Sequence, residues 1–508
     1  MIKAGGETGK DMVSGENKNN RKRPAWTAAG WIITVIQIVI SAAAVYILHQ
    51  SALVPEKMLI AGMAVLAVLI VVCRLLMKKK IRPVRFLIGA VIALAVSALL
   101  LAAGYYVGTL TTTLQDITDT TEEVASVGVY VLTDDPAESI ADTEGYVFGI
   151  LESIEREDTD NAVVQINTEL DSIVQVETYA GMDDLADALL SQECGAIVMS
   201  EQYVEVISEL DGYEDFEDQV KEIASYEWSY EVETTETDED TEAGISGYGV
   251  FTMYISGIDT YGAISTKSRS DVNIIAVVNT NTRQMLLIST PRDYYVPLSI
   301  SDGVKDKLTH AGLYGVEVSM DTLEMLYGVE LDYYFRVNFS GFEELIDALG
   351  GVTVVSEYEF DVEPDFHYVV GENELNGIEA LAFARERYSF AEGDRQRGEN
   401  QMAVITGVIQ KLQTPSVLYN FSDIMSGLEG SFETNMPYTD LSTLVRNQIS
   451  AGGSWDVQTY SVDGTGTTAS TYSLSRQVYV MEPDQETVEY AIELIEAVEN
   501  DEIVSVEE

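Results

Sequence analysis

Cysteine, histidine and basic residues are all scarce in this chain of 508 residues, and each scarcity excludes a class of site. The two cysteines, Cys73 and Cys194, lie far apart, which excludes a disulfide framework and a thiolate metal site. The three histidines, His49, His310 and His367, are scattered along the chain, which argues against a histidine-rich metal centre.

The low number of basic residues is the most informative of these scarcities. Lys and Arg together number 29 against 84 Asp and Glu, a formal net charge of −55. This charge argues against a nucleic-acid partner and against the soluble part lying flat on anionic lipid. Of the 29 bases, 13 lie in the first 86 residues, and 11 of the other 16 fall between Lys267 and Arg397. An acidic domain that gathers its few arginines in one region is predicted to hold an anion there, because guanidinium forks match phosphate.

Long apolar stretches are present near the N-terminus. Trp26–Leu48, Met58–Met77 and Phe86–Val107 are each about 20 residues long, enough to cross the hydrocarbon core of a bilayer. The alternative is a signal peptide or buried core helices, but three such stretches in succession exceed what a signal peptide needs. We therefore predict three transmembrane helices.

The flanking charges predict an orientation. Four bases between Lys18 and Arg23 precede the first span, and five between Lys78 and Arg85 separate the second from the third, whereas the first loop has only Lys57. The positive-inside rule then places the N-terminus in the cytoplasm and everything after the third span outside. We expect a multi-pass cell-membrane protein in which residues 1–107 form the anchor and the remainder is extracellular.

The region after the anchor divides by composition. We expect a Thr- and Asp-rich tether at residues 108–122, a small extracellular α/β accessory domain at 123–226 and an acidic linker at 227–246. The accessory domain is predicted to contain strands at Val127–Leu132, Val163–Asn167 and Ala196–Ser200 and a helix at Met182–Leu190.

Residues 247–498 form the third region, which contains a predicted hairpin. Val272–Val278 and Met285–Thr290 are almost wholly apolar, so both strands are predicted to be buried on both faces. The short polar link Asn279–Gln284 favours an antiparallel pair.

The register of this hairpin predicts a cluster of charges. Asp271 and Arg292 are equidistant from the turn, so they should lie side by side at the open end of the sheet. Arg269 lies just beyond, and Asp259 ends the preceding strand at Val250–Ser256.

Helical patterns alternate with the strands of this region. Phe342, Leu345, Ile346 and Leu349 form an apolar stripe that ends before two glycines. Arg385 continues the apolar face of a second helix. In a third helix Arg397 and Gln401 take the first inward positions, near a helix start where backbone N–H groups favour anions. This alternation predicts an α/β fold, an α–β–α sandwich.

Six motifs in this region resemble those of the LytR-CpsA-Psr family in order and spacing. They are GIDTYG (257–262), SRSD (268–271), STPRDYYV (289–296), KLTHAGLYG (307–315), LNGIEALAFARERY (375–388) and DRQRGENQ (394–401). The resemblance implies a catalytic domain with a long apolar tunnel for a polyprenyl tail. It implies an extracellular phosphotransferase that moves a glycopolymer, such as teichoic acid or capsule, from an undecaprenyl-pyrophosphate carrier to a peptidoglycan hydroxyl with the help of Mg²⁺.

The resemblance also implies residue roles. Asp259 and Asp271 correspond to metal ligands, Lys307 to a lysine at the pocket rim, and Asp394 to a residue that orients the arginines. Arg269, Asp271 and Arg292 are the candidate catalytic residues, and Asp271 is the first candidate for the general base. The residues that correspond to the pyrophosphate site are Arg269, Arg292, Arg385, Arg387, Arg397 and Gln401.

Two departures from the family pattern concern substrate preference. Thr309 stands where an Asn is usual, and Asn400 stands where a second Arg is usual. Outside the motifs, Arg283, Arg336 and Arg395 are interpreted as surface charges. Partners on this reading are the polyprenyl-linked glycopolymer, peptidoglycan and membrane lipid, with no nucleic acid.

Two alternatives remain open. The same site could hydrolyse a polyprenyl pyrophosphate with water as the acceptor, or the protein could be a non-catalytic surface receptor for a lipid carrier. Direct control of transcription conflicts with three membrane spans and the strongly negative charge.

Overall fold

The structure is a computed structural model, and it describes residues 22–51, 54–78, 83–118, 122–231, 249–258, 260, 264–363, 366–390, 393–414 and 432–506. It divides into two compact units, one of residues 1–111 with 445–450 and one of residues 112–444 with 451–508.

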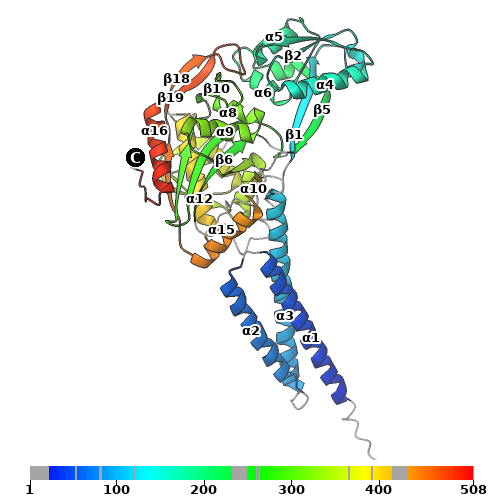
Figure 1. Cartoon of the computed structure of the whole chain (residues 1–508), viewed down its shortest axis with the longest axis vertical. Coiled ribbons are helices and arrows are strands. Elements are labelled where there is room, and N and C mark those ends of the chain that lie inside the picture. Colours follow the sequence, from blue (N-terminus) through cyan, green and yellow to red (C-terminus); the bar gives the residue numbers. More distant parts are fainter. Residues whose placement is uncertain are drawn as a thin grey trace, which may run out of the picture. The chain divides into compact units, whose positions relative to one another are not determined.

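The first unit contains the three apolar helices, and each is long enough to cross a membrane (Figure 1). The helices are α1 (Lys22–Gln50), α2 (Glu56–Leu76) and α3 (Pro83–Thr118). Their large apolar side chains are mostly exposed, as Trp31, Val68 and Leu99 are, which is the pattern of a surface that meets lipid. The expected tether is wrong in part, because α3 continues to Thr118 and so includes most of residues 108–122.

The accessory domain is a five-stranded sheet in the order β3-β2-β4-β1-β5, with α4 on one face and α5 and α6 on the other. Its elements are β1 (Glu122–Leu132), η1 (Ile140–Thr143), β2 (Val147–Leu151), α4 (Arg156–Glu169), β3 (Gln175–Tyr179), α5 (Met182–Leu190), β4 (Ala196–Ser200), α6 (Gln202–Ser208), α7 (Phe216–Gln219) and β5 (Val220–Glu231). The bounds predicted for α5 and β4 are confirmed.

Two predictions for this domain are wrong. Val163–Asn167 lies within α4 and is not a strand, because Ala162 and Ile166 are four residues apart and place one buried face on the sheet. The domain boundary at 226 falls inside β5, which pairs with β1 as far as Glu231. The rest of the predicted linker, residues 232–246, lies outside the described residues.

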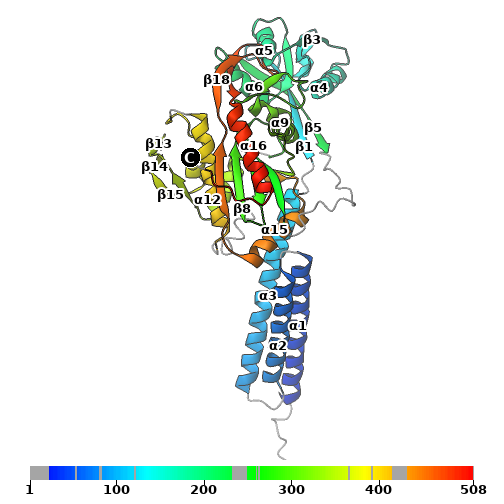
Figure 2. The same cartoon turned by 60° about the vertical axis from the view of Figure 1, so that its left-hand side comes forward.

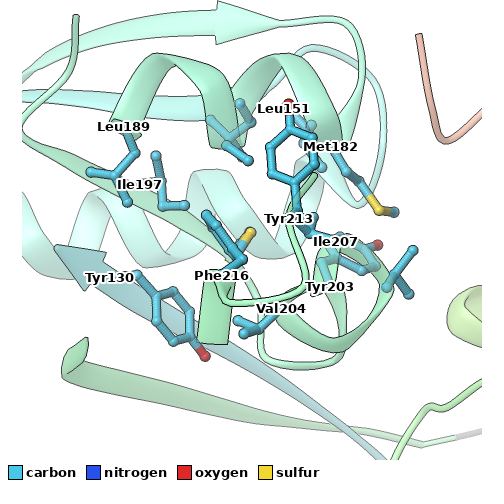
Figure 3. Close-up of a cluster of buried hydrophobic side chains, with 14 of the residues drawn as sticks. Tyr130, Leu151, Met182, Leu189, Ile197, Tyr203, Val204, Ile207, Tyr213 and Phe216 are labelled. Carbon is cyan, nitrogen blue, oxygen red and sulfur yellow. The ribbon is translucent and has the colours of Figure 1, made fainter. Parts of the chain in front are cut away.

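The core of the accessory domain is drawn in Figure 3. Met182 and Leu189 of α5, Tyr203 and Ile207 of α6 and Phe216 point toward one another in this cluster. Leu313 and Leu474, which come from the region after residue 247, belong to the same buried cluster. The two domains of the second unit therefore share a hydrophobic core.

The remaining region is built on a mixed six-stranded sheet in the order β16-β11-β6-β7-β8-β17. The strands of this sheet are β6 (Val250–Ile258), β7 (Ser270–Asn279), β8 (Gln284–Ser289), β11 (Tyr333–Asn338), β16 (Phe432–Thr434) and β17 (Asp456–Ser461). The other strands form two-stranded ladders outside it: β9 (Tyr295–Pro297), β10 (Lys305–Lys307), β12 (Val352–Ser356), β13 (Phe360–Val362), β14 (Phe366–Tyr368), β15 (Gly371–Leu375), β18 (Gly464–Ala469) and β19 (Val478–Pro483).

Helices cover both faces of the sheet, which confirms the α–β–α sandwich (Figure 2). They are α8 (Leu308–Ala311), η2 (Gly312–Tyr314), α9 (Val316–Tyr327), α10 (Phe339–Ala348), α11 (Gly377–Arg385), α12 (Asp394–Leu412), α15 (Tyr438–Ala451) and α16 (Gln485–Glu499). On β7, Ile275 and Val277 pack with α9 and α16, whereas Ile274, Ala276 and Val278 pack on the opposite face with Met402 of α12 and Leu441 of α15. Both faces of the predicted hairpin are therefore buried.

Arg336 is an internal charge and not the predicted surface charge. Its side chain is 2% exposed and forms an ion pair with Glu433 of β16, with an Nε–Oε1 distance of 3.0 Å. Its Nη2 also donates to the carbonyl oxygens of Ile264 and Thr266. This arginine ties the edge strand and the loop before β7 to β11.

We expect Arg336→Met to lower the free energy of unfolding by about 3–5 kcal/mol, because it leaves Glu433 charged and buried without its cation. The double variant Arg336→Met/Glu433→Leu should recover part of that loss, since no charge then stays buried. Urea denaturation of the full-length protein in detergent measures both. A single variant as stable as the wild type would contradict this account of Arg336.

Candidate active site

A cavity of about 610 Å³ lies between the sheet and helices α10, α11 and α12. Most of its wall is apolar, with side chains from β6, β11, α10, α11, α12 and β16. The apolar residues of the wall include Ile255, Ile258, Phe335, Val337, Phe342, Leu345, Ile378, Leu381, Ile405, Val408, Ile409 and Phe432. Such a wall accepts hydrocarbon, because burying apolar surface is favourable.

Charged and polar side chains line the same cavity. Six of the residues predicted from the sequence are among them: Asp271, Arg292, Arg385, Arg387, Arg397 and Gln401. They come from strands, loops and helices spread over residues 271–401 of the chain. The cavity therefore combines an apolar compartment with arginines and so suits a ligand that has both an apolar part and an anionic part.

The Asp271–Arg292 pair is fixed by the hairpin. In the β7–β8 ladder Ile274 pairs with Ser289, the register that places residues 271 and 292 opposite one another. Arg292 Nη1 donates to both oxygens of Asp271, at 3.0 and 2.9 Å. The hydroxyl of Thr309 donates to Asp271 Oδ1 at 3.2 Å. The residue that departs from the family pattern thus contacts the predicted metal ligand directly.

The environment keeps Asp271 ionised. Burial alone would raise the pKa of this carboxyl, but the charges of Arg292, Arg397 and Arg269 outweigh burial and hold the pKa below its ordinary value. A carboxylate with a lowered pKa is a weak base near neutral pH. This argues against Asp271 as the general base and suits it to hold a cation or the arginines.

Helix α12 brings Arg397 and Gln401 to the cavity through close contact with the sheet. A Cβ on Gly398 would lie 2.5 Å from Ser289 Oγ, so a larger residue would require the Ser289 side chain or the helix to shift. Asn400 lies on another side of the helix, where its Nδ2 donates to the carbonyl of Phe383 at 3.2 Å. The second departure from the family pattern therefore serves packing against α11.

Arg385 and Arg387 reach the cavity from the end of α11 and the segment that follows it. The Arg385 guanidinium lies 4.3 Å from the ring centroid of Phe339, and that of Arg387 lies 4.7 Å from the ring of Tyr388. Stacking on an aromatic face orients a guanidinium.

Arg269 is placed differently from the expectation. It is not among the residues that line the cavity, and its side chain is 4% exposed. Its guanidinium pairs with Glu205 and Glu209 of the accessory domain. Its backbone is held by Gly312, where a Cβ would lie 2.5 Å from the carbonyl oxygen of Ser268 and 2.7 Å from the backbone nitrogen of Ser270.

Three further predicted residues remain, and the structure describes the side chain of only one of them, Lys307. The Lys307 ammonium pairs with Asp293 at 2.9 Å, and Lys307 is not among the residues that line the cavity. Asp259 lies outside the described residues, as does the side chain of Asp394. Their assigned roles stay predictions.

Sequence reasoning missed Glu205, Glu209 and the contact of Thr309 with Asp271. The glutamates lie outside all six motifs, and their spacing of four residues indicates only a shared helix face. Thr309 was recognised as a departure from the family, but not as a partner of Asp271.

Comparison with known proteins places this geometry in context. The chain matches the LytR_cpsA_psr family over residues 219–490. It belongs to that family. The matched residues include every strand of the six-stranded sheet and all six cavity residues predicted from the sequence.

Named proteins are similar to about half of the chain. The polyisoprenyl-teichoic acid–peptidoglycan teichoic acid transferase TagU of Enterococcus faecalis is 31% identical over 237 residues, which is 46% of this chain and 77% of that protein. The protein of the same name from Bacillus subtilis is 32% identical over 229 residues, 45% of this chain and 73% of its own. The crystal structure of B. subtilis TagV aligns with a TM-score of 0.42 and 27% identity, over 51% of this chain and 99% of that one.

We expect the Asp271–Arg292 pair to make the stability of the folded protein depend on pH. Because the pKa of Asp271 is lowered by folding, its ionisation stabilises the protein above the ordinary Asp pKa of about 3.9, and the stabilisation is lost as the pH falls through the lower folded pKa. Urea midpoints at pH 7, 5, 4 and 3 should show Asp271→Asn less stable than the wild type at neutral pH, with the difference shrinking in acid.

Asp321→Asn is the matched control for this series, since Asp321 is an exposed residue of α9. Its stability difference from the wild type should stay small at every pH. If the difference in stability between Asp271→Asn and the wild type stayed constant across the pH series, the lowered pKa of Asp271 would be contradicted.

Proposed function

We propose that this protein transfers a glycopolymer from a polyprenyl-pyrophosphate carrier to a hydroxyl of peptidoglycan. Membership of the LytR_cpsA_psr family and likeness to teichoic acid transferases support the reaction class. The observation that carries the proposal is the cavity itself, which is lined by a mostly apolar wall together with Asp271, Arg292, Arg397 and Gln401. A polyprenyl tail fits such a wall, and a pyrophosphate fits the arginines.

The proposed reaction is a phosphoryl substitution. The acceptor hydroxyl oxygen forms a bond to the phosphorus that bears the glycopolymer, and the bond from that phosphorus to the bridging oxygen breaks. Polyprenyl monophosphate leaves, and the hydroxyl proton passes to solvent or to a basic group. Arg292 and Arg397 stabilise the charge that develops on the phosphate oxygens, and the apolar wall holds the tail.

Magnesium remains part of this proposal. Mg²⁺ takes oxygen ligands and is commonly held by one or two carboxylates together with substrate phosphates and water. The Asp271 carboxylate is suitably placed at the cavity, and the second proposed ligand, Asp259, lies outside the described residues. Within the described part of the chain no group of three or more His, Cys, Asp or Glu residues gathers as a metal cluster. A bound ion would neutralise phosphate charge.

We also propose that the N-terminus is cytoplasmic and the second unit extracellular. The three apolar helices support membrane anchoring, and the basic residues before the first helix and between the second and third favour this orientation. Peptidoglycan, the proposed acceptor, is outside the membrane, so the topology and the reaction agree.

A transfer assay with full-length protein in detergent, a polyprenyl-pyrophosphate glycan, Mg²⁺ and peptidoglycan fragments tests the reaction. We expect covalent glycan–peptidoglycan product, with Arg397→Ala slower by about 100-fold or more because a charge-stabilising donor is lost. Arg395→Ala is the matched control on the same helix: Arg395 pairs with Glu399 and Asp463 and is not among the cavity residues.

The same assay separates the alternatives. Polyprenyl phosphate released without conjugate, in the presence of acceptor, would favour the hydrolase. Lipid binding without turnover, unchanged by EDTA, would favour the receptor.

Binding of Mn²⁺, followed by electron paramagnetic resonance in the presence of inorganic pyrophosphate, tests the metal separately from activity. We expect Asp271→Asn to weaken the binding of Mn²⁺ by about 10-fold or more, since a carboxylate ligand is lost. Asp321→Asn should bind as the wild type does. Equal affinity in all three proteins would exclude Asp271 as a ligand.

A further inference from the structure

Arg269 is held by carboxylates that come from a different domain. Its Nη2 lies 2.9 Å from Glu205 Oε1 and its Nη1 lies 2.5 Å from Glu209 Oε2. The arginine is 4% exposed, whereas the two glutamate side chains are 57% and 52% exposed. The Arg269 guanidinium is thus buried, whereas the two glutamate side chains that pair with it are half exposed to solvent.

The packing of α6 fixes the side of the helix on which Glu205 and Glu209 lie. Tyr203, Val204 and Ile207 point into the core of the accessory domain (Figure 3). Glu205 and Glu209 are one helical turn apart, and so they share a face other than the buried one. Negative charge is unfavourable at the C-terminal end of a helix, and a cation compensates it there.

The accessory domain is also clamped to the region that carries Arg269. The Asp183 carboxylate accepts hydrogen bonds from the backbone nitrogens of Ser475 and Arg476, at 2.8 and 2.9 Å. The backbone nitrogen of Met182 donates to the carbonyl of Ser473 at 3.0 Å. Leu474, between these residues, is buried in the accessory core. The domain as a whole is therefore held in place.

Glu209 belongs to the wall of the catalytic cavity as well. It lines that cavity together with Asp271, Arg292 and Arg397. Arg269 lies near enough to these groups for Asp271 to favour its charged form. A carboxylate binds the guanidinium fork in the same way as a phosphate does. Glu205 and Glu209 therefore occupy guanidinium donors, next to the cavity, that match a phosphate equally well.

We propose that Glu205 and Glu209 act as an intramolecular anion that competes with phosphate groups for Arg269. This inference rests on the proposed function, since it assumes that the cavity receives a pyrophosphate. On binding, the two side chains rotate toward solvent and Arg269 exchanges two carboxylates for phosphate oxygens. The accessory domain thereby lowers the affinity of the cavity for phosphate groups.

Calorimetric binding of inorganic pyrophosphate to the full-length protein in detergent tests the competition. We expect Glu205→Gln/Glu209→Gln to bind pyrophosphate about 10-fold more tightly than the wild type, because charged partners of Arg269 are removed. Each single variant should lie between the two. Glu201→Gln is the control: it removes a charge beside α6 whose carboxylate acts on Glu222 and Tyr130.

Equal or weaker pyrophosphate binding by the double variant would overturn the proposal and leave the glutamates as neutralising partners of a buried arginine. The same holds if neither protein binds pyrophosphate. Thermal unfolding checks that each variant is folded. If the double variant does not fold, the single variants, which keep one carboxylate on Arg269, test the competition instead. Tighter binding together with no transfer product would overturn the proposed function and support the competition.

Discussion

The ion pair between Asp271 and Arg292 depends on one constraint, the register of the β7–β8 hairpin. Both strands are buried on both faces, so a slip of one residue would move every side chain to the opposite layer and disrupt two hydrophobic clusters at once. The packing of the sandwich thus enforces the register, and the register places the carboxylate against the guanidinium at the open end. The site is stabilised by the same burial that stabilises the sheet.

Much of this arrangement could be predicted from the sequence, because it follows from local rules. The apolar runs and the polar link between them fixed the hairpin, and counting from the turn paired Asp271 with Arg292. Periodicity placed Arg397 and Gln401 on the inward face of α12. These predictions required only the period of an element and the direction in which its side chains point.

The errors came from interactions that have no local signature. Val163–Asn167 is apolar enough for a short strand, but it belongs to a helix whose other residues are mostly polar. Arg336 was interpreted as a surface charge because its partner, Glu433, is distant in the sequence. Glu205 and Glu209 were missed for the same reason: their significance comes from the packing of one domain on another. Motifs find the residues of a site, whereas the environment of those residues depends on the tertiary fold.

The apolar wall of the cavity contributes more binding free energy for a ligand that comes from water than for one that comes from a lipid bilayer. A chain taken from water gains the full free energy of leaving it, about 0.8 kcal/mol for each methylene group. A chain taken from a bilayer exchanges one hydrocarbon environment for another and gains little. If the ligand is the membrane lipid proposed above, lengthening its tail would therefore add almost nothing to affinity, and discrimination between headgroups would rest on the arginines. Water-soluble short-chain analogues would report the contribution of the wall and exaggerate its importance for such a lipid.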